Sequence, residues 1–295
     1  SIVGADTVCY NTRPDTMRVL NLPTGGDLSY SYQWLESLSG NGPWAPVVGQ
    51  TGTTYRPGNL LASRYYRLLM RSGSGCGVDS SNVVMVRAWL DVVPAQAGAN
   101  SPSICYDSST YVYRLSGASG SDGNFSYQWQ RKQSGIWTNI SGATSDTFYT
   151  GSLQQTTQYR LRTISAFGCS DKFSDSVVVQ VYSQFNSGVL RSFSNICYDT
   201  SPDTLRFNIA PTGGGGSYGY QWQDSIVGGN WTDVAGATSS SYRPGNTADA
   251  ILPCTGSVIV GLWFFVYTVE SCFGLLTIFG RIDSWLGYGL LQHAS

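Results

Sequence analysis

The sequence predicts an all-β protein made of three tandem β-sandwich domains, because one pattern returns three times along its 295 residues. Each copy opens with Cys-Tyr, contains a central Tyr-Gln-Trp and a second Trp, and then reaches a turn. Successive Cys-Tyr pairs stand 96 and 92 residues apart, which is the length of one small repeated domain. The copies of the central motif with its flanking residues lie at 29–34, 124–129 and 217–222.

The composition supports the same class. The chain holds 35 Gly, 19 Tyr and 9 Trp, as expected for many strands joined by turns. Strong helix formers are scarce, because Glu occurs only at Glu36 and Glu270 and Lys only at Lys132 and Lys172. We expect domains at 1–93, 94–184 and 185–295, joined by short and partly apolar linkers that favour a semi-stiff rod.

Within the first repeat, apolar and polar residues alternate over several short runs bounded by Gly-rich and Pro-rich turns. About seven short strands, a Trp on the third of them and a disulfide are typical of an immunoglobulin-like sandwich. The predicted strands cover 17–22, 30–36, 44–48, 53–55, 64–71 and 83–89.

The two tryptophans of each repeat receive different predictions. The first Trp follows alternating aromatic residues on a strand, so we expect it to be buried in the core. The second lies beside a Gly-rich turn, where it either completes the core or stacks on a sugar. The predicted core residues are Trp34, Trp129 and Trp222, and the possible glycan contacts are Trp44, Trp137 and Trp231.

Four cysteines stand at matching places in the first two repeats. Cys9 and Cys76 lie 67 residues apart, and Cys105 and Cys169 lie 64 apart. One pair in each small domain predicts the disulfides Cys9–Cys76 and Cys105–Cys169 and an oxidising compartment. The alternative is free cysteines buried in the core.

Several classes of function are excluded or unsupported by the sequence. The only histidine, His293, lies at the end of the chain, which leaves no Ser-His-Asp or Cys-His machinery and no His-based metal site. The net charge of -1 and the absence of a basic stripe argue against nucleic acid. We therefore expect no enzyme activity, no cofactor and no metal, although Asp-rich turns leave calcium as an alternative. Those turns contain Asp6, Asp15, Asp107 and Asp203.

The order Cys-Tyr, Gly-Gly, Tyr-Gln-Trp-Gln, Trp, Gly-Ala-Thr-Ser, Tyr-Arg-Pro-Gly and Tyr-Tyr-Arg, up to a second Cys, resembles the Ig-like repeats of large surface adhesins of Bacteroidota. The resemblance covers residues 5 to about 250. It implies export by the type IX secretion system and a non-enzymatic role at the cell surface. Proteins of that phylum carry O-glycans on Ser or Thr after Asp, which would place glycans on this chain. The matching residues are Thr7, Thr16, Ser176, Thr204 and Ser225.

The pattern breaks in the third repeat. In place of the expected Tyr-Tyr-Arg and Cys, the chain continues as an apolar run with Glu270 as the one charge between 258 and 280. A transmembrane helix is one reading of that run. Back-translation in the neighbouring reading frame restores most of the missing repeat, so we interpret 251–295 as out-of-frame sequence. If ordered, 251–282 should form extended strands in the places of the missing sixth and seventh strands, and Cys254 and Cys272 should not bridge to Cys197.

Together these features predict an extracellular surface rod or adhesin that belongs to a longer chain or filament. Its expected partners are other surface proteins, copies of itself or surface glycans. The first alternative is a carbohydrate-binding array that uses the second Trp of each repeat. The second is a surface protein anchored in the membrane by the apolar tail, although we expect no membrane contact if the tail is out of frame.

Overall fold

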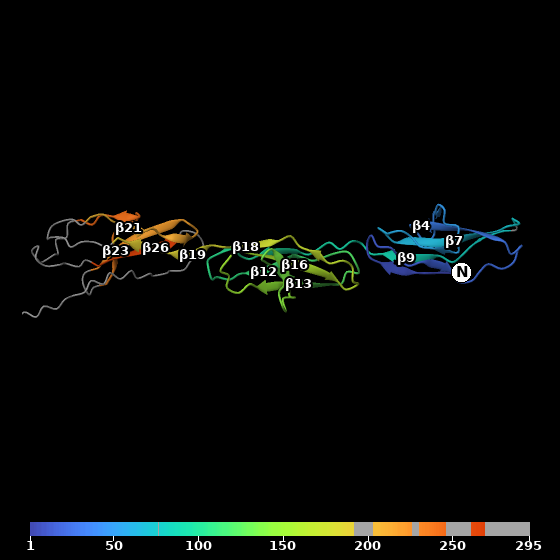
Figure 1. Ribbon diagram of the computed structural model, residues 1–295, viewed down its shortest axis with the longest axis horizontal. Helices are drawn as coiled ribbons and strands as arrows, with labels where there is room; N and C mark the ends of the chain where they lie inside the picture. Colours follow the sequence, from blue (N-terminus) through green and yellow to red (C-terminus); the bar gives the residue numbers. More distant parts are fainter. Residues whose placement is uncertain (76, 192–202, 226–229, 246–260, 269–295) are drawn as a thin grey trace, which may run out of the picture. The chain divides into compact units, whose positions relative to one another are not determined.

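The computed structural model describes residues 1–75, 77–191, 203–225, 230–245 and 261–268. All regular elements in this part of the chain are β-strands, which confirms the predicted class of tandem immunoglobulin-like β-sandwiches (Figure 1). The chain divides into two compact units, and the division runs through the second repeat. Unit 1 contains Ser1–Asn100, Tyr111–Phe148 and Gln158–Val177, and unit 2 contains Ser101–Thr110, Tyr149–Thr157 and Val178–Ser295.

The first repeat contains β1 to β9. Its strands are β1 (Ile2–Val3), β2 (Asp6–Val8), β3 (Met17–Val19), β4 (Tyr30–Ser37), β5 (Ala45–Pro46), β6 (Thr54–Tyr55), β7 (Arg64–Ser72), β8 (Val78–Ser80) and β9 (Val84–Ala88). One sheet has the order β1-β3-β6, and the other has the order β2-β9-β7-β4-β5 with β8 paired to β7. Strand β2 runs parallel to β9, whereas β4, β7 and β9 form an antiparallel set (Figure 1).

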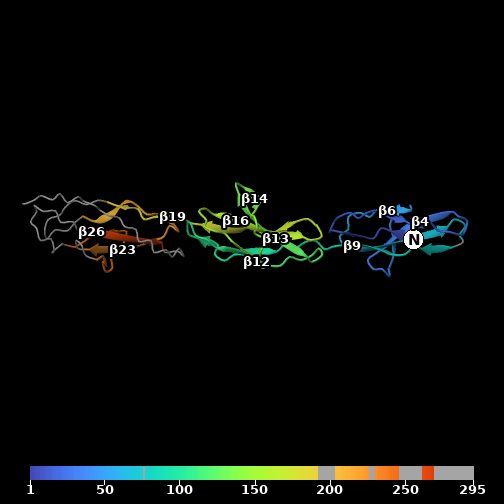
Figure 2. The same cartoon turned by 90° about the horizontal axis from the view of Figure 1, so that it is seen from below.

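The second repeat contains β10 to β18. Its strands are β10 (Gln96–Ala99), β11 (Ser103–Ile104), β12 (Tyr111–Ser116), β13 (Phe125–Gln133), β14 (Ile136–Asn139), β15 (Thr147–Tyr149), β16 (Thr157–Ser165), β17 (Lys172–Phe173) and β18 (Val177–Val181). In unit 1, β13 pairs with β14 and β16 (Figure 2), and β17 pairs with β16. In unit 2, β11 pairs in parallel with β18, as β2 does with β9.

The third repeat contains β19 to β26. Its strands are β19 (Ser183–Asn186), β20 (Val189–Leu190), β21 (Leu205–Ile209), β22 (Thr212–Gly214), β23 (Tyr218–Ser225), β24 (Thr232–Asp233), β25 (Ser241–Tyr242) and β26 (Gly261–Thr268). Strand β26 lies antiparallel beside β23, and both views show the two side by side (Figures 1 and 2). The off-pattern sequence therefore forms a strand over 261–268, as predicted, so a continuous helix through 258–279 is wrong. The predictions for the rest of the tail and for Cys197, Cys254 and Cys272 lie outside the described residues.

A common register shows that β26 occupies the place of the sixth strand. Trp34 of β4 faces Leu68 of β7, and Trp129 of β13 faces Leu161 of β16. In the third repeat the backbone of Trp222 in β23 pairs with that of residue 264 in β26, in the same antiparallel register. The sequence of the tail differs from the repeat, but the backbone pairing beside the central Trp is the same.

The core of each repeat forms around the first Trp. Trp34, Trp129 and Trp222 have 0% of their surface exposed, which confirms the prediction that they are buried. In the first repeat the side chains of Met17, Leu68 and Val86 surround this position in one apolar cluster. Alternate residues of β16 are buried, as expected for a strand with one face on the core.

Among the described residues, none belongs to a helix long and apolar enough to cross a membrane.

Candidate functional site

The Tyr-Gln-Trp motif of the central strand fixes a neighbouring loop, which lies between β14 and β15 in the second repeat. In the second repeat the Trp129 indole Nε1 donates to the Ser145 carbonyl at 3.0 Å, and the Gln128 amide donates to the Ile140 carbonyl at 2.7 Å. Gln33 and Gln221 make the equivalent amide bonds at 2.8 and 3.0 Å. Because Trp and Gln each satisfy a loop carbonyl, the motif is structural in all three repeats.

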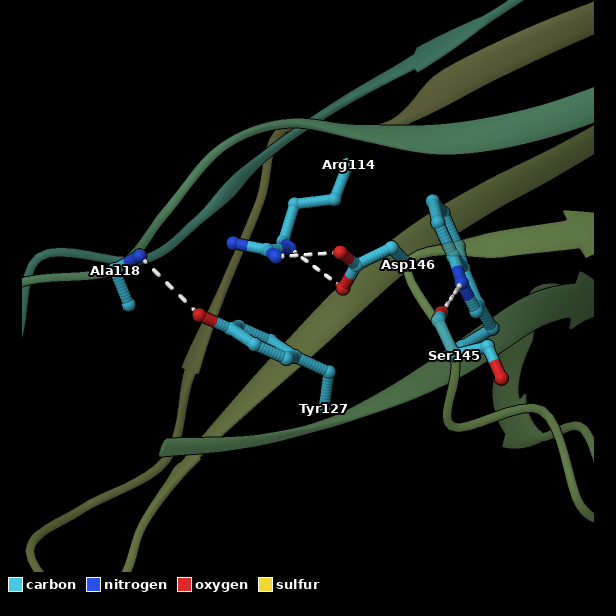
Figure 3. Close-up of polar contacts among 6 residues, drawn as sticks. Arg114, Ala118, Tyr127, Ser145 and Asp146 are labelled. Carbon is cyan, nitrogen blue, oxygen red and sulfur yellow. Dashed lines mark hydrogen bonds and ion pairs between the residues drawn. The ribbon is translucent and has the colours of Figure 1, made fainter. Parts of the chain in front are cut away.

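An ion pair holds the end of the same loop in the second repeat (Figure 3). The Arg114 guanidinium donates to both carboxylate oxygens of Asp146, at 2.9 and 2.7 Å, and lies 4.8 Å from the centre of the Tyr127 ring. The hydroxyl of Tyr127 accepts the Ala118 N–H at 3.3 Å. The hydrogen bond from Arg114 lowers the pKa of Asp146, and the same bond raises the pKa of Arg114.

The second Trp of each repeat, predicted as a possible glycan contact, is half-buried in all three repeats. In the first two it stacks under an arginine of the neighbouring long strand. The Arg67 guanidinium carbon lies 4.4 Å from the centre of the Trp44 ring, and that of Arg160 lies 4.5 Å from Trp137. The guanidinium covers one face of each indole, so a sugar could stack only on the other.

The surroundings of the two arginines differ. In the second repeat the Arg160 Nε donates to the Gln130 side-chain oxygen at 2.7 Å, and burial lowers the pKa of Arg160. In the first repeat Leu35 follows the core Trp where Gln130 does in the second. The Arg67 Nε is accordingly buried with no hydrogen-bond partner among the described residues.

A disulfide joins the first two repeats. Cys9, directly after β2, is bonded to Cys169, in the turn between β16 and β17, with their Cα atoms 5.5 Å apart. The predicted pairs Cys9–Cys76 and Cys105–Cys169 are therefore wrong. Cys105 is also disulfide-bonded, and Cys76 lies outside the described residues.

The strand pairing explains why the pairs within one repeat are excluded. Because β2 runs parallel to β9, Cys9 lies at the end of the sheet where β9 finishes and β7 begins. The described residues Gly75 and Gly77, on either side of position 76, come after the far end of the 9-residue strand β7. A strand of that length spans about 30 Å, whereas disulfide-bonded Cα atoms are at most about 7 Å apart.

Further contacts surround the Cys9–Cys169 bond. The Trp89 ring, directly after β9, meets Phe167 edge-to-face with centroids 6.1 Å apart. The Lys172 ammonium lies 3.1 Å from an Asp91 carboxylate oxygen. Ser121 and Ser165 share a buried hydrogen bond of 2.7 Å beside Cys169. No signal within a single repeat could have revealed this junction, since its residues come from two of them.

The remaining predicted sites are the Asp-rich turns and the glycosylation residues. The Asp6 carboxylate accepts the backbone N–H groups of Thr7 and Asp15 at 2.7 and 2.9 Å, so it caps a turn. In the described part of the chain no three His, Cys, Asp or Glu side chains are grouped to hold a metal. Of the predicted glycosylation residues, Thr16, Ser176 and Thr204 are exposed, whereas Thr7 and Ser225 are half-buried.

The profile of one domain family, the domain of unknown function DUF8696, matches residues 1–88, 94–183 and 186–251. The chain belongs to this family. Three matched segments follow one another at the spacing of the repeated pattern, and each contains one Tyr-Gln-Trp motif with its core Trp. A search of curated proteins finds no match.

Several solved structures are similar to the DUF8696 chain at low identity. The three N-terminal domains of the bacteriophage RB49 highly immunogenic outer capsid protein share 10% identity, over 79% of this chain and 77% of that one, with a TM-score of 0.35. Murine CEACAM1b shares 13% identity over 61% of this chain and 100% of its own, with a TM-score of 0.29. The fibronectin(III)-like modules of Clostridium thermocellum CbhA share 8% identity over 61% and 91%, with a TM-score of 0.25.

Proposed function

We propose that this chain is a non-enzymatic, extracellular surface protein whose DUF8696 repeats form a covalently tied rod and present a surface for adhesion. The observation that carries the proposal is the Cys9–Cys169 bond between consecutive repeats. A disulfide of this kind persists in oxidising compartments such as the cell exterior. It also ties two folded repeats together, which serves a protein that spans distance under tension. The proposed partners are other surface proteins, further copies of the chain or surface glycans.

Single-molecule force spectroscopy, in which the chain is pulled from its two ends, tests whether the first two repeats are covalently linked. The bond separates residues 160 apart in sequence, so the segment between them is shielded from force. We expect reductant to release at least about 55 nm of additional contour length, at about 3.5 Å per residue, because it also opens the disulfide of Cys105. Without reductant, the variant Cys169→Ser should already be longer than the unaltered chain, and in reductant the two should reach the same length. An unchanged contour length in reductant would argue against a tied pair of repeats.

Location at the surface is tested separately. On intact cells that produce the chain, we expect a membrane-impermeant amine reagent to label Lys132 and Lys172, whose repeat would face the medium. Labelling seen only after the cells are lysed would contradict an exposed surface protein.

A second proposed function is recognition of glycans by the Trp–Arg stacks. The half-buried Trp137 favours it, because Arg160 and Lys132 lie on this indole and the Arg160 guanidinium also lies over the Phe173 ring. Binding to a glycan array should be lost in Trp137→Ala and kept in Tyr111→Ala, which removes an exposed aromatic residue from β12. Equal glycan binding by the two variants would contradict glycan recognition through Trp137.

A further inference from the structure

The segment before the central strand receives the linker of the preceding repeat. In the second repeat, Val93 and Ser119 exchange backbone hydrogen bonds of 2.9 and 3.1 Å, and the Ser121 N–H donates to the Leu90 carbonyl at 3.0 Å. The Asp91 carbonyl lies directly on Gly120, where a Cβ atom would stand only 2.0 Å from its oxygen. Val92, the next linker residue, is buried with 4% exposed.

The third repeat repeats this arrangement within unit 2. Linker strand β19 pairs antiparallel with β22, which precedes the central strand β23. A Cβ atom on Gly213 would stand 1.8 Å from the Gln184 carbonyl oxygen. The next linker residue, Phe185, packs on Tyr218 with ring centroids 5.9 Å apart. The two junctions thus have the same arrangement. A linker carbonyl lies against the glycine before the central strand, and the next linker residue is apolar.

The glycine of this position and its neighbours form a seat for the linker, and in the first repeat no described residue occupies the equivalent seat. Gly25 precedes its core Trp by nine residues, as Gly120 and Gly213 do. The three glycines have nearly the same left-handed φ, +86°, +88° and +80°. A Cβ atom on Gly25 would nevertheless meet no atom within 4 Å. The seat is already in its receiving conformation, because the Tyr30 hydroxyl donates to the Gly25 carbonyl as that of Tyr218 does to Gly213.

The surface around the empty seat is open and partly apolar. Residues 24–29 are all exposed, whereas Gly120 and Ser121 of the occupied seat are half-buried and buried. Leu22 and Leu28, which flank Gly25, have 67% and 76% of their surface exposed. Exposed leucines beside an exposed turn mark an interaction site.

We propose that the seat formed by residues 22–28 binds the linker end of another DUF8696 repeat. The occupant is an extended segment whose carbonyl rests on Gly25 and whose next residue is apolar, as in Asp91-Val92 and Gln184-Phe185. It adds a short strand to this edge through backbone hydrogen bonds to residues 24 and 26. The first repeat can thereby be joined head-to-tail to a further repeat. This proposal does not depend on adhesion or on any glycan.

The test adds one more repeat to the full chain. Residues 95–187 are fused directly before Ser1, so that a second repeat and its linker precede the first repeat. The linker is then in register, because Gly188, Ala95 and Ser1 are the equivalent positions directly before β20, β10 and β1. Hydrogen exchange is followed by mass spectrometry in peptides covering 22–31, which occur once in the fusion. We expect the amides of Thr24 and Gly26, the equivalents of Ser119 and Ser121, to exchange about tenfold more slowly or better than in the chain alone.

Paired variants make the result specific. In the fusion, Gly25→Ala should abolish the slowing, because its Cβ would meet the incoming carbonyl at about the distance found for Gly120 and Gly213. Gly49→Ala is the matched control: its φ is also left-handed, at +72°, and a Cβ there meets no atom within 4 Å. It should keep the slowing. Unchanged exchange at residues 24 and 26 in the fusion, or equal slowing in both variants, would overturn the proposal.

Discussion

Replacing Trp129 by Ala should strongly destabilise the second repeat, whereas replacing Trp137 should not. Trp129 has no exposed surface, faces Leu161 across the sheet and donates to the Ser145 carbonyl. Removing a buried Trp costs about 3–5 kcal/mol. A domain of this size has a total stability of about 5–15 kcal/mol, so the loss is a large share of it. Trp137 is half-buried in the same repeat and contributes an arginine stack of about 0.5–1 kcal/mol.

Hydrogen exchange of the full chain, read in peptides of β13 and β16, separates these two effects. We expect Trp129→Ala to accelerate exchange throughout the second repeat by about 100-fold or more, since each 1.4 kcal/mol is a factor of ten. Trp137→Ala should accelerate it less than about tenfold. Trp129→Phe should fall between them, because it keeps an aromatic ring but loses the bond to Ser145. Similar acceleration in the two alanine variants would refute the assignment of core and surface tryptophans.

Three further predictions concern the junction, the loop and the arginine stack. In thermal unfolding, Gly120→Val should lower the melting temperature far more than Gly123→Val. Both glycines have left-handed φ, but only Gly120 lies under a backbone carbonyl. Equal melting temperatures of the two variants would contradict this. The lowered pKa of Asp146 means that its ion pair stabilises the fold above the unfolded pKa of about 3.9 and that this contribution is lost as pH falls through the folded value. Asp146→Asn should therefore reduce the loss of stability between pH 5 and 2, which is measured by following the unfolding midpoint as a function of pH. The same pH dependence in the variant and the unaltered chain would argue against a stabilising ion pair. Leu35→Gln should stabilise the first repeat slightly by giving the buried Arg67 Nε the partner that Gln130 gives Arg160, and a lower unfolding midpoint in urea would show otherwise.

Sequence periodicity predicted the long strands well. The strands predicted at 30–36 and 64–71 appear as β4 and β7 with ends shifted by one residue. Strands β1, β2 and β8 have two or three residues, which is too short for alternation to show. The predicted strand at 17–22 ends at Val19, and Leu20 and Leu22 beyond it are exposed.

The disulfides show where sequence spacing stops being informative. The similar spacing of Cys9 and Cys76 and of Cys105 and Cys169 indicated equivalent positions, which is consistent with the repeat. Spacing does not state at which end of a sheet a residue lies. The parallel pairing of β2 with β9 places Cys9 at the end of the sheet from which it bonds to Cys169 of the next repeat. A Gly nine residues before each core Trp was visible in the sequence, but its purpose appears only with the linker carbonyl above it.

A disulfide map of the full chain tests the account most directly. The oxidised protein is digested without reductant, and the linked peptides are identified by mass spectrometry. We expect the peptide containing Cys9 to be linked to the peptide containing Cys169. A peptide linking Cys9 to Cys76, or Cys105 to Cys169, would show that each repeat closes its own disulfide and would contradict a rod tied from one repeat to the next.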